Sequence, residues 1–181
     1  METNGDLSAL LTSTATDVAH IELTSRCNLR CVYCAMSQPG YQGTDLDVSC
    51  IDEVLNTLED RRTGLIYVNG HGESTMIKGW DQVCTRMLDR GMRLSIVSNF
   101  ARRFNDLEVD TLSRFHQICV SCDTMDAELF AELRPKARLA TLLENMARIR
   151  ERARQERREG PRLSWSIANS RRCFNRKSPC A

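Results

Sequence analysis

The chain has 181 residues, a length typical of one domain with a sizeable apolar core. Hydrophobic residues make up 41% and charged residues 27% of the chain, and the formal net charge of +1 provides no bulk attraction to nucleic acids or membranes. No apolar stretch approaches the roughly 20 residues that span a bilayer. The first residues lack the basic start and apolar run of a secretory signal, so we expect a cytoplasmic protein.

Strands and helices are predicted to alternate along the chain. In chain order, we expect a strand at residues 17–23, a helix at 48–60, a strand at 65–69, a helix at 79–90, a strand at 92–98, a helix at 107–115, a strand at 117–121, helices at 126–133 and 139–159, and a strand at 162–168. Regular alternation of this kind predicts an α/β fold with a mainly parallel sheet.

Three regions are expected from the composition. Residues 1–16 form an N-terminal extension, residues 17–168 the α/β core, and residues 169–181 an irregular basic tail. A second basic run lies within the core, at residues 148–158, where Arg alternates with Glu at helical spacings. That spacing favours a solvated helix face over an RNA-binding arm, and we predict no nucleic-acid partner.

Nine cysteines are many for a cytoplasmic chain of this size, and their odd number argues against a disulfide framework. Three of them, Cys27, Cys31 and Cys34, have CxxxCxxC spacing, which lets one loop wrap a compact metal centre. A 4Fe–4S cluster usually takes four thiolates, so three ligands leave one iron open to a substrate or cofactor. A structural zinc site with a remote fourth ligand such as Cys50 remains an alternative.

The segment ELTSRCNLRCVYC resembles the opening of the radical S-adenosylmethionine (radical SAM) superfamily, with Tyr33 at the family's aromatic position. The resemblance implies a partial parallel (β/α) barrel with a 4Fe–4S cluster whose open iron binds S-adenosyl-L-methionine. It implies an enzyme that reductively cleaves this cofactor to a 5′-deoxyadenosyl radical, which abstracts hydrogen from a peptide or small-metabolite substrate. A reducing partner such as flavodoxin or ferredoxin is implied as well.

A glycine-rich motif follows the second predicted strand. Gly70, Gly72 and Glu73 resemble the family's GGE element, with His71 in place of the first glycine of the strict motif. The resemblance implies that Glu73 and the neighbouring backbone hold the cofactor's amino group through a charge-assisted hydrogen bond. Glycines at these positions allow close backbone approach and unusual dihedral angles.

Further polar residues lie at the ends of later predicted strands, where barrel active sites gather. Ser98 and Asn99 match a pair that lies near the cofactor ribose in the family, and Ser121 and Asp123 resemble its SxD element. Arg134 follows at the distance where many relatives carry an arginine for the cofactor carboxylate. By resemblance, all five residues are therefore expected to bind the cofactor, together with Tyr33.

The remaining cysteines of the core have apolar-patterned surroundings. Cys50, Cys84, Cys119 and Cys122 are predicted to act as small buried hydrophobes.

The chain departs from the family pattern after the fifth predicted strand. The family core has six strand–helix units, so the resemblance implies a short or divergent member with about five of them. Cys173 and Cys180 in the tail are too few for a second full cluster. Two alternatives to an enzyme remain open, a non-catalytic module with zinc or an electron-transfer cluster and a degenerate fragment that retains the motif.

Overall fold

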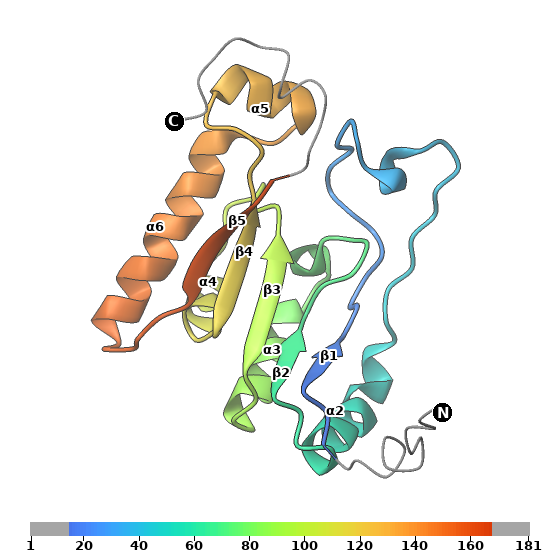
Figure 1. Ribbon diagram of the computed structural model, residues 1–181, viewed down its shortest axis with the longest axis vertical. Helices are drawn as coiled ribbons and strands as arrows, with labels where there is room; N and C mark the ends of the chain where they lie inside the picture. Colours follow the sequence, from blue (N-terminus) through green and yellow to red (C-terminus); the bar gives the residue numbers. More distant parts are fainter. Residues whose placement is uncertain (1–14, 168–181) are drawn as a thin grey trace, which may run out of the picture.

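A computed structural model of the protein describes residues 15–167; the predicted tail and most of the predicted N-terminal extension lie outside this range, as do Cys173 and Cys180. Its centre is a five-stranded sheet in the order β1-β2-β3-β4-β5, with every neighbouring pair parallel (Figure 1). Helices connect the successive strands. The predicted α/β fold with a parallel sheet is confirmed.

The elements have the following bounds. In chain order they are β1 (Val18–His20), the 3₁₀ helices η1 (Ala35–Ser37) and η2 (Val48–Cys50), α2 (Ile51–Asp60), β2 (Leu65–Tyr67), η3 (Ser74–Met76), α3 (Trp80–Asp89), β3 (Leu94–Ser98), α4 (Asp106–Ser113), β4 (Gln117–Ser121), α5 (Ala127–Leu133), α6 (Leu139–Gln155) and β5 (Arg162–Ser166).

Several predicted elements are longer than the observed ones. The strand predicted at residues 17–23 ends at His20, although the Ile21 N–H still donates to the Tyr67 carbonyl at 2.9 Å. Beyond that point the backbone turns away from β2 to pair with a returning loop. The last predicted helix ends at Gln155 rather than 159, because Arg157 adopts a left-handed backbone conformation with φ of 53°.

The apolar core lies on the helix side of the sheet. The strands contribute five residues to it that are essentially inaccessible: Ile66, Leu94, Ile96, Ile118 and Val120. Val68, directly after β2, is equally buried. Helices α3 and α4 are drawn behind the strands in Figure 1, and α4 contacts both α3 and α6. Because side chains alternate along a strand, the opposite face carries the other set, which is largely polar.

Two of the four cysteines predicted to be buried hydrophobes are so. Cys84 and Cys122 belong to the core, with 0% and 5% of their surface exposed. Cys50 and Cys119 are only half-buried. Cys119 pairs in register with Val97 and Ser164, which places it on the polar face of β4, opposite the helices.

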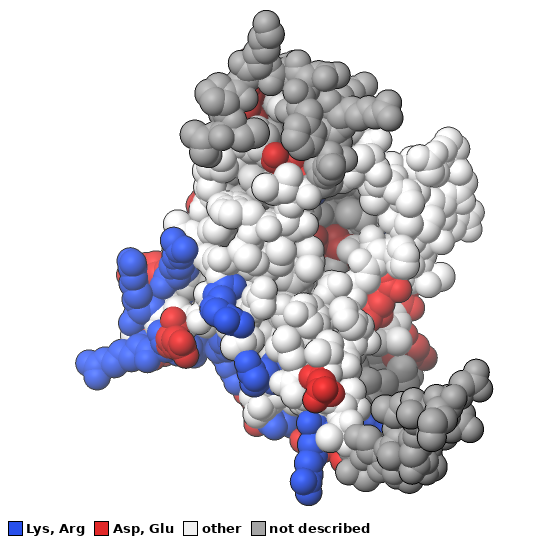
Figure 2. Space-filling view, in the orientation of Figure 1, with Lys and Arg blue, Asp and Glu red and all other residues white. Residues whose placement is uncertain are grey.

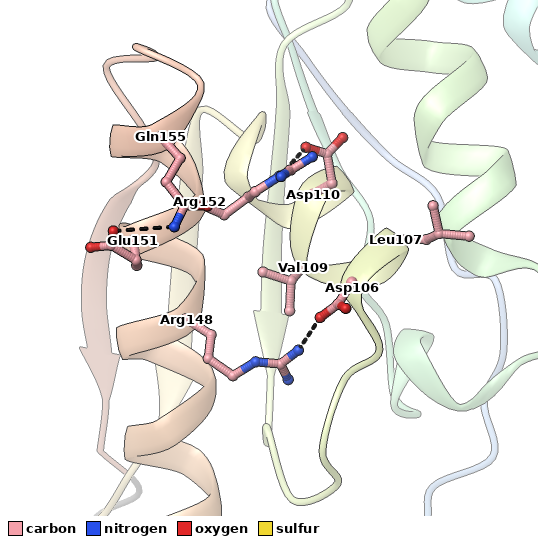
Figure 3. Close-up of a pocket in the computed structure, with 8 residues that line it drawn as sticks. All are labelled: Asp106, Leu107, Val109, Asp110, Arg148, Glu151, Arg152 and Gln155. Atoms are coloured by element: carbon pink, nitrogen blue, oxygen red, sulfur yellow. Dashed lines mark hydrogen bonds and ion pairs between the residues drawn. The ribbon is translucent and has the colours of Figure 1, made fainter.

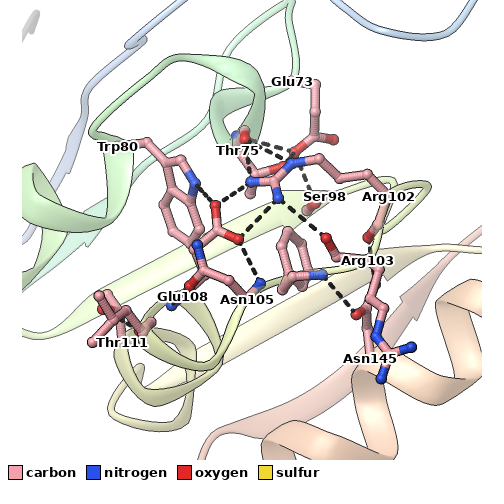
Figure 4. Close-up of polar contacts among 12 residues, drawn as sticks. Glu73, Thr75, Trp80, Ser98, Arg102, Arg103, Asn105, Glu108, Thr111 and Asn145 are labelled. Carbon is pink, nitrogen blue, oxygen red and sulfur yellow. Dashed lines mark hydrogen bonds and ion pairs between the residues drawn. The ribbon is translucent and has the colours of Figure 1, made fainter.

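A buried carboxylate ties the loop after β3 to α3 and α4. The Glu108 carboxylate accepts hydrogen bonds from Trp80 Nε1 at 2.9 Å and from Arg102 Nη1 at 2.9 Å, and it forms a capping box with Asn105 (Figure 4). Burial opposes its ionisation, but the Arg102 hydrogen bond and the other donors outweigh burial and lower the pKa of Glu108 below its ordinary value.

Carboxylates of α4 neutralise part of the basic run at residues 148–158. Arg148 Nη2 lies 2.7 Å from Asp106 Oδ1, and Arg152 Nε lies 2.8 Å from Asp110 Oδ1, across a groove between the two helices (Figure 3). This arrangement agrees with a helix face whose charges are internally balanced.

Within residues 15–167, no helix is long and apolar enough to cross a membrane.

Substitution of Glu108 tests the buried network. Glu108→Gln should lower the free energy of unfolding at pH 7 by about 1–3 kcal/mol, because the Arg102 charge and three donors lose their ionised acceptor. Since the folded-state pKa of Glu108 is depressed, its stabilisation is present above the unfolded pKa and is lost as pH falls through the folded value. The difference in thermal midpoint between wild type and variant should therefore be smaller at pH 4 than at pH 7.

The matched control is Glu53→Gln, which removes an exposed glutamate from the first turn of α2. An equal loss of stability in both variants at pH 7 would contradict a special role for Glu108.

Candidate metal and cofactor site

The loop that carries the three cysteines leaves the sheet at the carboxyl end of β1, and its two ends are joined by a short antiparallel contact. Leu46 N–H donates to the Leu23 carbonyl at 2.9 Å, and Thr24 and Asp45 form an isolated bridge. The Asp45 side chain accepts from Thr24 Oγ1 at 2.6 Å and forms an ion pair with Arg26. This closure makes residues 26–44 a loop with a fixed base.

Gly72 lies directly against that base. A Cβ atom on Gly72 would lie 2.3 Å from the Arg26 carbonyl oxygen and 2.4 Å from that of Thr24. The next residue, Glu73, donates its backbone N–H to the same Arg26 carbonyl at 2.9 Å. Neither Gly70 nor Gly72 has a positive φ, so close approach rather than an unusual dihedral angle requires glycine at Gly72.

The three thiols of the loop are free and near one another. Cys31 is buried, whereas Cys27 and Cys34 are half-buried, and the Cys34 N–H donates to the Cys31 carbonyl at 3.1 Å. Burial raises the pKa of the Cys27 and Cys31 thiols, and electrostatic repulsion between the members of the trio raises it further. Thiols with raised pKa values become thiolates when a cationic metal centre binds them.

Glu73 is 3% exposed and joins the end of β2 to the end of β3. Its Oε1 atom accepts from Thr75 Oγ1 at 2.7 Å and from Ser98 Oγ at 2.8 Å (Figure 4). Within residues 15–167, Oε2 accepts one hydrogen bond, from the backbone N–H of Asn99 at 2.7 Å. A carboxylate offers about four acceptor positions, so Oε2 retains acceptor capacity.

Asn99 connects this network to the cysteine loop. Its Nδ2 group donates to Asn28 Oδ1 at 2.9 Å and lies 3.8 Å from the sulfur of Cys27. The Leu29 backbone N–H lies 3.5 Å from the same sulfur. Two N–H groups therefore point at the Cys27 thiol, an arrangement that stabilises a thiolate ligand.

A second buried group joins the loop to β4 and α5. Arg134, which is 6% exposed, donates from Nε to Asp123 Oδ2 at 2.7 Å and from Nη2 to Asp123 Oδ1 at 3.3 Å. The Tyr33 hydroxyl donates to the same Oδ2 at 2.8 Å, and Arg134 Nη1 lies 3.9 Å from Cys31 Sγ. The Arg134 guanidinium also lies over the Tyr33 ring, 5.5 Å from its centroid.

Burial and mutual contacts shift the pKa values of Arg134 and Tyr33. Burial opposes the charged form of Arg134, but the Asp123 hydrogen bond and the neighbouring acidic groups raise the pKa of Arg134 above its ordinary value. Burial also raises the pKa of Tyr33, with Arg134 opposing and the Asp123 hydrogen bond reinforcing the shift. Tyr33 therefore acts here as a neutral hydrogen-bond donor.

The structure brings most of the predicted site residues together at the carboxyl ends of β1 to β4. Ser98 faces Glu73 rather than open space, and Ser121 makes no side-chain hydrogen bond within residues 15–167. Sequence reasoning missed Asn28 and Asp45, whose roles depend on contacts with Asn99 and Thr24 that no local pattern reveals.

The donor chemistry of the site fits an iron–sulfur cluster. Three thiols from one loop are available, with N–H donors beside Cys27 and a guanidinium beside Cys31. Within residues 15–167, no three His, Cys, Asp or Glu side chains converge tightly enough to hold a single metal ion. A cluster uses a separate iron for each thiolate, so its ligands are spaced more widely than those of one ion.

The fold and the cysteine loop together define a parallel α/β protein with a three-thiol site at the carboxyl ends of its strands. The chain belongs to the Radical SAM superfamily, whose profile matches residues 21–155. This family uses a 4Fe–4S cluster and S-adenosylmethionine as its cofactors.

Similar proteins include the GTP 3′,8-cyclases of Mycobacterium sp. strains KMS and JLS, each 30% identical over 164 residues. The alignments include 83% of this chain but only 44% of those relatives, so the chain spans less than half of their length. Among solved structures, Streptococcus suis SuiB bound to S-adenosylmethionine matches with a TM-score of 0.70 at 16% identity, over 93% of this chain and 39% of SuiB. Methylornithine synthase (PylB) matches with a TM-score of 0.61 at 12% identity, over 86% and 46% of the two chains. These structures share the fold.

Gly72→Ala tests the contact at the base of the loop. The added methyl group meets two backbone carbonyl oxygens that cannot move without opening the loop closure. We expect a loss of stability above about 3 kcal/mol, in the range of severe core overpacking, together with reduced iron content after reconstitution.

Gly40→Ala is the matched control, because its Cβ meets nothing within 4 Å and the cost comes only from φ of 82°. Chemical denaturation and iron analysis of both variants provide the comparison. Equal effects would mean that the close approach at Gly72 is unimportant.

Proposed function

We propose that this chain reductively cleaves S-adenosyl-L-methionine and directs the resulting 5′-deoxyadenosyl radical to a hydrogen atom of a peptide or small-metabolite substrate. One observation carries the proposal. Two donors are directed at thiols of the loop. Asn99, which follows β3, donates toward Cys27, and Arg134, which follows α5 and is held by Asp123, donates toward Cys31. The polar networks and the thiols therefore form one continuous site.

Cys27, Cys31 and Cys34 would hold the cluster. When bound and reduced, the cluster supplies the electron that breaks a carbon–sulfur bond of the cofactor. The chain's own residues hold the reactants in place: Asn99 and the Leu29 backbone fix the Cys27 sulfur, and Arg134 fixes that of Cys31.

Glu73 and Arg134 are suited to the two charged groups of the cofactor's methionine end. Oε2 of Glu73 has one donor in the structure and accepts an ammonium in its remaining position. Arg134 Nη1 points toward the cysteine loop, while its other nitrogens are bound to Asp123. We assign the cofactor amino group to Glu73 and the carboxylate to the region of Arg134. Gly70, Gly72, Ser98, Asn99 and Ser121 complete this site, with Tyr33 and Asp123 orienting Arg134.

The similarity to GTP 3′,8-cyclases makes a purine nucleotide the first small molecule to test as substrate. A reducing partner such as flavodoxin or ferredoxin would supply the electron. The seven cysteines within residues 15–167 are all free, which fits the reducing conditions of a cytoplasmic location.

Anaerobic reconstitution with iron and sulfide tests the core of the proposal. The reduced protein should give a 4Fe–4S electron paramagnetic resonance signal that changes when S-adenosylmethionine is added, and dithionite should yield 5′-deoxyadenosine. Cys27→Ala, Cys31→Ala and Cys34→Ala should each abolish the signal, whereas Cys84→Ala, which removes a core thiol, should retain it. Zinc near one atom per chain without sulfide, or a cluster that does not respond to the cofactor, would overturn the proposal.

Arg134→Lys tests the assignment of the cofactor carboxylate. Lysine keeps the charge but loses the fork that binds Asp123 at two positions, so we expect cofactor affinity to fall at least about tenfold at unchanged iron content. Titration of the electron paramagnetic resonance signal measures the affinity. Arg138→Lys, an exposed neighbour at the start of α6, is the control and should bind the cofactor normally.

A further inference from the structure

Three basic side chains meet at the amino-terminal edge of the sheet, opposite the cysteine loop. Arg93 immediately precedes β3, His116 immediately precedes β4, and Arg162 is the first residue of β5. Arg93 Nη2 lies 2.7 Å and Arg162 Nη2 lies 3.2 Å from the same atom, His116 Nε2. The backbone fixes this meeting, because the Arg162 N–H donates to the His116 carbonyl at 3.1 Å.

The cluster has no directly paired negative charge within residues 15–167. Two guanidinium groups share a single imidazole nitrogen, which has only one lone pair to offer. Within residues 15–167, neither Arg93 nor Arg162 forms an ion pair with a carboxylate. Glu159 acts on His116 electrostatically but is not within ion-pair distance of either arginine. Two guanidinium groups held this close repel each other, and an anion placed between them would relieve that repulsion.

Two arginines of α6 differ in this respect. Arg148 and Arg152 are bound to carboxylates of α4. Figure 2 shows Lys and Arg side chains gathered over the region where α6 ends and β5 begins, so the cluster lies within a basic part of the surface. A positive potential of this kind raises the local concentration of anions.

We propose that Arg93, His116 and Arg162 form a binding site for a phosphoryl group, carried by a small phosphorylated molecule. The guanidinium fork matches phosphate oxygens, and two forks converging from neighbouring strands provide the donors that a phosphate dianion accepts. The strands β3 and β4 have five residues each, which places about 17 Å between this edge and the cysteine end. The phosphoryl group is therefore held at a separate site, remote from the radical chemistry.

The pKa of His116 provides a measure of phosphate binding at this site. Burial, Arg93 and Arg162 lower the pKa of His116, and Glu159 opposes them. A phosphate between the guanidiniums neutralises their charge and accepts a hydrogen bond from the protonated Nε2, so binding raises that pKa. The chain has only three histidines, His20, His71 and His116, which makes the imidazole signals readily assignable by substitution.

Calorimetric titration of the full-length reconstituted protein with inorganic phosphate, without S-adenosylmethionine, tests the site independently of catalysis. Arg93→Gln and Arg162→Gln should each weaken phosphate binding at least tenfold. Arg150→Gln, which removes an exposed α6 arginine without a carboxylate partner within residues 15–167, should change the affinity less than twofold. Equal weakening by all three variants, or competition by chloride at equal concentration, would reduce the site to diffuse surface charge and overturn the proposal.

Two further measurements refine the test. One compares possible carriers of the phosphoryl group, and the other separates failure of this site from failure of the proposed function. Tighter binding of a sugar phosphate than of inorganic phosphate supports a phosphorylated metabolite, whereas the reverse order overturns that part of the proposal. In nuclear magnetic resonance titrations, phosphate should raise the pKa of His116 and leave His20 and His71 unchanged. An unshifted His116 overturns the proposal even if the protein cleaves S-adenosylmethionine normally.

Discussion

The contact between Gly72 and the base of the cysteine loop is the constraint on which the site depends. The backbone at Gly72 lies so close to the carbonyls of Thr24 and Arg26 that any side chain would separate them. Glu73 then donates to the Arg26 carbonyl and, through its carboxylate, holds Ser98 and the backbone of Asn99. One close approach thus fixes the start of the loop against β2 and, one residue later, against β3. Loss of this contact would separate the thiols from the groups that orient them.

Two buried polar networks organise the site differently. The Glu73 carboxylate is held by neutral donors from the turn at Thr75 and from the end of β3, so it acts as a junction between these two segments. Arg134 is instead matched by a single carboxylate, Asp123, which also accepts the Tyr33 hydroxyl. An isolated buried charge is strongly unfavourable, whereas a charge with several fixed partners is tolerated and restricts the geometry around it. The thiols lie between these two networks, so their positions are set by electrostatic groups on both sides.

The sequence predicted the fold well because the fold depends on local patterns. Apolar periodicity located all five strands. The CxxxCxxC spacing selected Cys27, Cys31 and Cys34 as candidate cluster ligands, and that assignment stays a prediction. Boundaries were less accurate where tertiary contacts decide them: β1 ends at His20 because the following residues pair with the loop near Asp45. The sequence predicted a close backbone approach at Gly72, but not that the approaching segment is residues 24–26. Asn28 was missed because its contact with Asn99 spans 71 positions of the chain. Such long-range pairs have no signature in a single sequence.

The distribution of charge on the folded protein could not be predicted from the sequence either. The most basic run of the core, at residues 148–158, is conspicuous in the sequence, but α4 supplies carboxylates that neutralise much of it. The basic cluster without an ion-paired carboxylate comes from Arg93, His116 and Arg162, which are scattered through the chain and inconspicuous individually. Parallel strands bring their starts to one edge and their ends to the other, so a sheet sorts distant residues into two separate groups. In this protein the carboxyl edge gathers thiols and paired charges, whereas the amino edge gathers positive charge, so the two edges differ in chemical character.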